Sequence, residues 1–221
     1  MSDETPPPFV AGWPLADEPG TERLAGDLRG LLDAMRRADA PTAELDRAAA
    51  LIREATSILA PHRVEGMPMQ GRLGTNGPVG GASVRPEEFF PWSPILGPLN
   101  PMSAAMHLEF DAATESMHGV ATFDTRFVGP PGMVHGGIIA LAFDELLGTA
   151  NVCLGLGAFT GTLSVRYDRP TPIETEVTME ARVERTEGRK VFTVGTITHA
   201  GEVTARAEGV FIRTGLWEKK A

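Results

Sequence analysis

The chain has 221 residues, 42% of them hydrophobic, which is enough for one domain with a proper core and an appendage, or for two small domains. Acidic residues outnumber basic ones by 29 to 20, for a net charge of −9, and this excludes a general nucleic-acid surface because phosphate binding needs a basic face. No apolar run approaches the roughly 20 residues of a membrane span, and the N-terminus lacks the pattern of a signal peptide. We therefore expect no membrane span and a cytoplasmic location. The single cysteine, Cys153, excludes an internal disulfide, and its apolar neighbours favour a small buried residue over a nucleophile.

The first 60 residues divide into two parts. Residues 1–20 are rich in proline and acidic residues, which predicts a flexible arm. From 21 to 60, apolar residues recur at helical spacing on both sides of Pro41, which predicts a helical hairpin. The hairpin must bury its apolar stripes, either by packing on the main domain or on a second subunit, or by forming a lid over a site.

Residues 61–99 are dense in glycine and proline, and this composition predicts a linker of turns with little regular structure. Phe89, Phe90 and Trp92, followed by Ile95 and Leu96, form an apolar cluster within it. These side chains either anchor the linker onto the core or line a tunnel for an apolar ligand.

Residues 100–215 combine strand patterns with one apolar helix. Period-two alternation with short turns predicts an antiparallel sheet. The expected strands are 107–110, 119–123, 160–167, 174–183, 191–198 and 203–214, and the expected helix runs from Gly136 to Cys153. A single apolar helix with no partner helix must be wrapped by the sheet. The expected fold is therefore α+β: a curved antiparallel sheet around one central helix, the hotdog arrangement, with an N-terminal helical extension.

The helix beginning at Gly136 carries the clearest signs of chemistry. Its start follows His135 and offers unpaired N–H groups at the positive end of the helix dipole, and two glycines leave that backbone open. An acidic pair, Asp144-Glu145, interrupts the apolar run, and a buried carboxylate is costly unless it is paired or used. Each feature also has a structural explanation without catalysis. The two glycines would only allow close packing against a neighbouring strand, and Asp144 would act as a cap or pair with an arginine. Glu145 projects about 100° away and is expected on the surface or behind the site.

These residues resemble the hotdog-fold acyl-CoA thioesterases of the PaaI and thioesterase-superfamily type, which carry His-Gly-Gly at the central helix start and an acid nine positions after the histidine. The likeness spans roughly residues 100–215, including Gly-Pro-Pro-Gly at 129–132 and Tyr-Asp-Arg-Pro at 167–170. It implies Asp144 as nucleophile or general base, with the Gly136 N–H as oxyanion donor. Thr160, sixteen residues past the acid, would hold the attacking water or bond to Asp144.

The resemblance also implies an acyl-CoA substrate, with coenzyme A as part of that substrate and no further cofactor or metal. Four residues are candidates for binding it: His135, Gly137, Asn100 and Arg169. His135 is expected to shape the loop and bond to backbone or substrate rather than to act as a base. Arg169 would offer a local positive charge to the phosphates of coenzyme A; in the alternative, it is a solvated charge on an exposed strand face.

Helix geometry predicts more than one subunit. Asp144 lies about half a turn around the helix from His135, so one helix cannot aim both ends of the motif at one substrate atom. Because the resembled enzymes build their sites between subunits, we expect a homodimer, with a tetramer also open. The rival hypotheses are a non-catalytic acyl-CoA sensor and a hotdog dehydratase, whose helix motif is missing here. The acyl length, and the choice between coenzyme A and an acyl-carrier protein, stay open.

Overall fold

The structure, a computed structural model, describes residues 17–64, 70–71 and 86–213. Four α-helices, two short 3₁₀ segments and six strands follow one another along this part of the chain. Their bounds are α1 (Glu18–Arg37), α2 (Thr42–Leu59), η1 (Ala60–His62), α3 (Pro86–Phe89), β1 (His107–Asp111), β2 (Ser116–Thr122), η2 (Thr125–Phe127), α4 (Gly136–Cys153), β3 (Ala158–Tyr167), β4 (Glu176–Glu187), β5 (Lys190–His199) and β6 (Glu202–Arg213).

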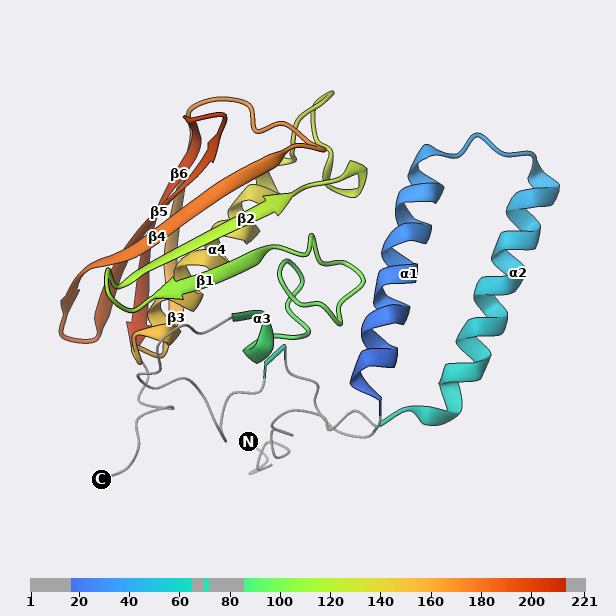
Figure 1. The fold of residues 1–221 in the computed structure, drawn as a ribbon, viewed down its shortest axis with the longest axis horizontal. Helices are drawn as coiled ribbons and strands as arrows, with labels where there is room; N and C mark the ends of the chain where they lie inside the picture. Colours follow the sequence, from blue (N-terminus) through green and yellow to red (C-terminus); the bar gives the residue numbers. More distant parts are fainter. Residues whose placement is uncertain (1–16, 65–69, 72–85, 214–221) are drawn as a thin grey trace, which may run out of the picture.

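The six strands form one antiparallel sheet that curves around α4 (Figure 1). The strand order is β1-β2-β4-β5-β6-β3, so β3 is an edge strand although the helix leads directly into it. The predicted α+β hotdog fold with an N-terminal helical extension is confirmed.

Alternation along the strands separates the two faces of the sheet. In β4, Val177, Met179 and Ala181 are buried against α4, while the residues between them are exposed. On the helix, Phe143 and Leu147 have no exposed surface. Burial of a large apolar side chain stabilises the fold by about 1.5–3 kcal/mol, so this shared core holds the helix inside the sheet.

The apolar cluster predicted in the linker belongs to the core. Phe90, Ile95 and Leu96 are buried within it, which favours the anchoring interpretation over a ligand tunnel. The rest of the glycine- and proline-rich segment, residues 65–69 and 72–85, lies outside the described residues.

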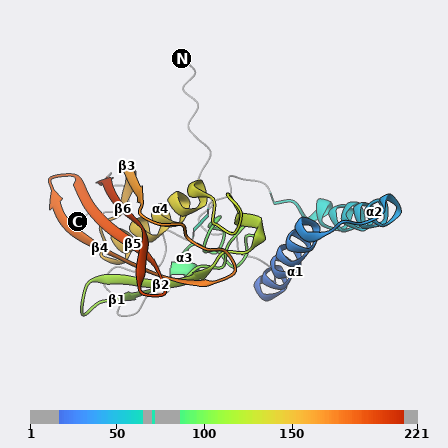
Figure 2. The same cartoon turned by 90° about the horizontal axis from the view of Figure 1, so that it is seen from above.

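The first helix begins at Glu18, earlier than its apolar periodicity indicates, because the Asp17 side chain caps it by accepting a hydrogen bond from the Gly20 N–H. Most of the predicted flexible arm, residues 1–16, lies outside the described residues. Both hairpin helices lie at one end of the domain, beyond the sheet (Figure 2).

Polar contacts hold α1 against the domain. Arg29 donates to the carbonyl oxygens of Pro98 and Asn100, and Thr125 donates to Asp33. Burial, with the nearby positive charge of Arg126, lowers the pKa of the Arg29 guanidinium from its ordinary value.

One described helix, α4, is long and apolar enough by composition for a membrane span. It is the core helix of the sheet and half of it is buried inside the structure, so its apolar character is explained by packing.

Candidate functional site

The start of α4 presents one open backbone donor. His135 caps the helix, and its Nδ1 accepts a 3.0 Å hydrogen bond from the Gly137 N–H. As the first helical residue, Gly136 has no acceptor for its own N–H within the helix, and none is found elsewhere in the described ranges. Of the two glycines singled out in the sequence, Gly136 is thus the one whose N–H is free among the described residues, and Nδ1 of His135 is engaged at the helix start.

Tyr167 of β3 fixes the orientation of this helix start. Its hydroxyl donates a 2.8 Å hydrogen bond to the Gly136 carbonyl oxygen. Sequence reasoning gave Tyr167 no role, although it is the single tyrosine of the chain and precedes a recognised Asp-Arg-Pro. Those two facts were the signal that could have singled it out.

A surface hollow of about 350 Å³ lies beside Gly136. Pro130, Met133 and Ile139 give it apolar walls, and Tyr167 and Arg169 line it as well. The structure therefore brings the predicted binding residue Arg169 to the same hollow as the helix start.

Charged residues around this hollow are already paired with one another. The Arg169 guanidinium lies 2.9 Å from Glu202. Asp168 accepts from Arg206 and also pairs with Arg166, and the Arg206 hydrogen bond holds the pKa of Asp168 below its ordinary value. A phosphate entering here would compete with Glu202 for Arg169.

Asp144 lies in the middle of α4, facing β3. The Thr160 hydroxyl donates a 2.7 Å hydrogen bond to Oδ1 of Asp144, so the structure brings these two predicted residues together. None of the described residues donates to Oδ2. One carboxylate oxygen is therefore oriented by protein and the other remains available to a ligand or water.

A β-bulge aims Thr160 at the helix. The β3–β6 register shifts between Thr160 and Thr162, with Gly161 as the extra residue. Thr160 is thereby opposite Phe211, whose side chain is buried on the inner face of the sheet. Without this bulge, the alternation that points Leu163 inward would turn Thr160 outward.

Glu145 is buried, with 8% of its surface exposed, so the alternative that placed it on the surface is wrong. Ser93, in the loop before β1, donates a 2.7 Å hydrogen bond to Oε1 of Glu145. Burial raises the pKa of Glu145 above its ordinary 4.5; the charge of Asp144 adds to this, and hydrogen bonds from Ser93 and Gln70 oppose it. Sequence reasoning missed this contact because Ser93 lies 52 positions away in an irregular segment.

Asn100, a predicted binding residue, makes its hydrogen bonds within its own loop, and Cys153 is buried as expected. Asn100 donates from its side chain to the Trp92 carbonyl oxygen and accepts from the Met102 N–H, which fixes its own loop. Cys153 is buried, and burial raises the pKa of its thiol to about 12, which disfavours a thiolate. No cluster of three metal-ligating side chains occurs in the described part of the chain.

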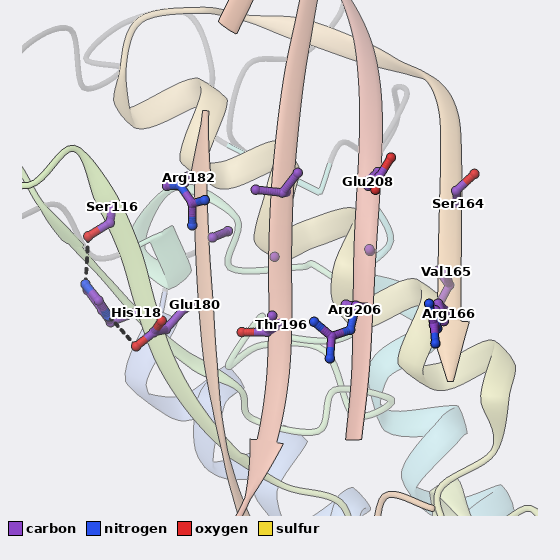
Figure 3. A pocket seen from close by; sticks show the side chains of 14 residues that line it. Ser116, His118, Ser164, Val165, Arg166, Glu180, Arg182, Thr196, Arg206 and Glu208 are labelled. Atoms are coloured by element: carbon purple, nitrogen blue, oxygen red, sulfur yellow. Dashed lines mark hydrogen bonds and ion pairs between the residues drawn. The ribbon is translucent and has the colours of Figure 1, made fainter. Parts of the chain in front are cut away.

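A second, larger hollow of about 590 Å³ lies on the outer face of the sheet, away from α4 (Figure 3). Charged side chains of neighbouring strands line it, among them Arg182, Glu180, Arg206 and Glu208. His118 lies between Ser116 and Glu180 at one side. Acidic and basic groups alternate here, so the hollow has no single-sign field that would select one class of ligand.

The curved antiparallel sheet wrapped around a central helix defines a hotdog protein. The capped glycine start and the oriented carboxylate make that helix its candidate site. The chain belongs to the thioesterase superfamily. The family model described as thioesterase superfamily matches residues 131–206. A crystal structure of a thioesterase superfamily protein superposes with a TM-score of 0.77 at 30% sequence identity, over 94% of this chain and 97% of that one.

Curated relatives match over less than half of this chain. Acyl-coenzyme A thioesterase THEM4 of Xenopus laevis is 46% identical over 65 residues, which is 29% of each chain. Acyl-coenzyme A thioesterase THEM5 of Homo sapiens is 32% identical over 94 residues, 41% of this chain and 38% of that protein. The matches thus span 29% and 38% of the length of these relatives.

Proposed function

We propose that this protein hydrolyses acyl-CoA thioesters to a free acid and coenzyme A. The observation that carries the proposal is the pairing of Asp144 with Thr160 in a superfamily chain that also keeps the Gly136 N–H open. The names of the curated relatives support the same reaction and substrate class. The reaction as proposed needs no cofactor beyond the coenzyme A of its substrate.

In the proposed reaction, the thioester carbonyl oxygen accepts a hydrogen bond from the Gly136 N–H. Asp144 either takes a proton from water as that water attacks the carbonyl carbon, or attacks that carbon itself to form a mixed anhydride. The carbon–sulfur bond breaks and coenzyme A leaves as the thiolate; in the second route water then cleaves the anhydride. Loss of one oxyanion donor typically raises such a barrier by about 3 kcal/mol.

One chain cannot bring both groups to the same thioester. Gly136 and Asp144 are separated by eight residues of α4, or about 12 Å along the helix axis. Their partners on β3, Tyr167 and Thr160, are about 23 Å apart along that strand. A water attacking a carbonyl must lie within about 3 Å of it, so the two halves must come from two chains.

We propose a homodimer in which β3 pairs with β3 of a second copy. Among the described strands, β3 pairs only with β6, which leaves its other edge open. An antiparallel pair centred on Ser164, which would face its own copy, would set Thr160 opposite Tyr167 of the partner subunit, because Gly161 is the extra residue of the bulge. Each interface would then hold two composite sites, each with Asp144 from one chain and Gly136 from the other.

The test is release of free thiol from short-chain, aromatic and long-chain acyl-CoAs by wild type and by Asp144→Asn. We expect turnover of part of the panel and a loss of at least about 100-fold in kcat in the variant. Asp46→Asn on exposed α2 is the matched control and should keep wild-type rates. Saturable acyl-CoA binding without turnover by wild type would overturn the proposal and favour a sensor, and an undiminished rate in Asp144→Asn would overturn the role of the acid.

A further inference from the structure

The first N-terminal helix leaves an apolar stripe uncovered. One side of α1 packs on the domain, where Ala25 is buried. An adjacent side carries Leu24, Leu28, Leu31 and Met35 at helical spacing, with 36–65% of each residue exposed. Four large apolar residues in line on a helix normally face another element.

The second helix is more exposed still, because α2 has no buried residue. Its large apolar residues are exposed by 45–62%: Leu45, Leu51, Ile52, Ile58 and Leu59. The two helices run side by side without packing closely enough to cover these residues (Figure 1). An apolar surface of this extent marks an interaction site.

The apolar stripe of α2 is self-complementary about its midpoint. Leu45 and Leu59 lie seven residues before and after Ile52, with the small residues Ala49 and Ala55 three residues to either side of it. Reversing the helix therefore exchanges large with large and small with small. A two-fold contact between identical chains requires this property, because residue i meets j and j meets i.

We propose that the α1–α2 hairpin docks on the hairpin of a second copy of this chain, through an antiparallel α2–α2 contact centred on Ile52. Leu45 would then pack against Leu59 of the partner subunit. The apolar stripe of α1 would flank this contact on one side, and the side chains of Leu51 and Ile58 of α2 would flank it on the other. The four helices of the two hairpins would then share one apolar core.

The exposed area is sufficient for a stable contact between copies. The nine exposed apolar residues of α1 and α2 present about 800 Å² per chain, which is what one partner contributes to an interface of standard size. The surface lies at the opposite end of the molecule from β3 (Figures 1 and 2). It is thus a contact separate from the proposed β3 pairing.

The charges of the hairpin favour a protein partner over a membrane. Helices that bind membrane surfaces carry a face rich in lysine and arginine. The hairpin has no lysine, and α2 has three acidic residues and two basic ones in a chain of net charge −9. An anionic lipid surface would repel this chain.

Disulfide cross-linking tests the geometry directly. Ile52→Cys places a thiol on the proposed two-fold axis, where it meets its own copy. Ala50→Cys is the matched control, since it lies two residues away on the opposite side of the same exposed helix. The native Cys153 is buried, so wild type should not cross-link. Mild oxidation at low micromolar concentration should convert Ile52→Cys to a covalent dimer at least about tenfold faster than Ala50→Cys.

Equal rates for the two cysteine variants, or no cross-link in Ile52→Cys, would overturn the proposal. Ile52→Glu supplies a second readout, because it would set two carboxylates against each other on the axis. In a mixture of Thr56→Cys and Ala48→Cys proteins, the proposed contact sets the two thiols opposite each other, so the two proteins should cross-link. Adding Ile52→Glu to the Thr56→Cys protein should abolish that cross-link. Sedimentation of wild type with phosphatidylserine vesicles, lost in Ile52→Glu, would instead identify a lipid surface and also overturn the proposal.

Discussion

The Thr160 hydroxyl and Oδ1 of Asp144 lie 2.7 Å apart, joined by a hydrogen bond from strand β3 to helix α4. This contact orients one carboxylate oxygen and leaves the other available. It also depends on the bulge at Gly161, because that extra residue turns Thr160 to the inner face of the sheet. The orientation of the proposed catalytic acid is thus built into the edge strand.

Removing this hydrogen bond should lower the rate without removing the acid. Hydrogen bonds to charged groups contribute about 1.5–3 kcal/mol, so Thr160→Ala should reduce kcat for acyl-CoA hydrolysis by roughly 10- to 100-fold. Thr160→Ser keeps the hydroxyl and should stay within a few-fold of wild type. If Thr160→Ala matched wild type in a free-thiol assay, orientation by this residue would be disproved.

Adding a methyl group at the open donor should impair catalysis more than stability. A Cβ built on Gly136 lies 3.4 Å from the Tyr167 hydroxyl, close to ordinary contact, so Gly136→Ala should fold. The methyl group would obstruct approach to the N–H, and we expect kcat to fall about 100-fold. Gly148→Ala on the same helix, whose Cβ meets its nearest atom at 3.9 Å, is the control and should keep its rate. Equal rates for both variants would contradict the oxyanion assignment.

Tyr167 should act through the geometry of the helix start. Tyr167→Phe removes the hydrogen bond to the Gly136 carbonyl, and because the residue is half-exposed, packing changes little. We expect about 1 kcal/mol less stability in chemical denaturation and a lower kcat with KM nearly unchanged. A rise in KM alone would instead show that Tyr167 binds substrate.

Glu145 should make stability depend on pH. Its folded-state pKa is raised by burial above its ordinary 4.5, so the folded state binds the proton more tightly than the unfolded state does. The stabilising contribution of the neutral acid is present below pH 4.5 and is lost as the pH rises through the folded-state pKa. Glu145→Gln keeps an oxygen acceptor for Ser93 and stays neutral at every pH.

The free energy of unfolding of Glu145→Gln should therefore exceed that of wild type at pH 8, with the difference shrinking towards pH 4.5. Urea titrations of both proteins across this range measure the difference. Glu54→Gln, on the exposed face of α2, is the control and should show no such trend. A difference that is constant with pH would refute a raised pKa at Glu145.

The sequence predicted the layout of the fold because its signals there are local. Alternation in β4 and β5 and the unbroken apolar run of α4 report burial directly, and the helix was expected from Gly136 to Cys153, where it lies. Asp144 and Gly136 stood out for the same reason, as a charge within an apolar run and a glycine at a helix start.

Contacts between distant segments could not be predicted from local patterns, and the bond between Thr160 and Asp144 was expected only from the family resemblance. The Ser93–Glu145 hydrogen bond joins an irregular loop to the helix, and no periodicity signals it. Simple alternation along β3 predicts that Thr160 faces outward, because it does not account for the bulge at Gly161. A single glycine is the only sign of that bulge in the sequence. Tyr167 reaches the Gly136 carbonyl from β3, an edge strand of the sheet. The order of the strands along the chain does not reveal that β3 lies at the edge.

Complementation between two inactive variants tests the central claim, a thioesterase site shared by two chains. Asp144→Asn and Gly136→Ala would each be impaired alone. After unfolding and refolding together, half of the dimers would be mixed, and each mixed dimer would hold one intact site, restoring about a quarter of wild-type thiol release. Recovery to that level is the predicted result; a mixed sample no more active than its two components, with mixed dimers demonstrated by differential tagging, would contradict the account.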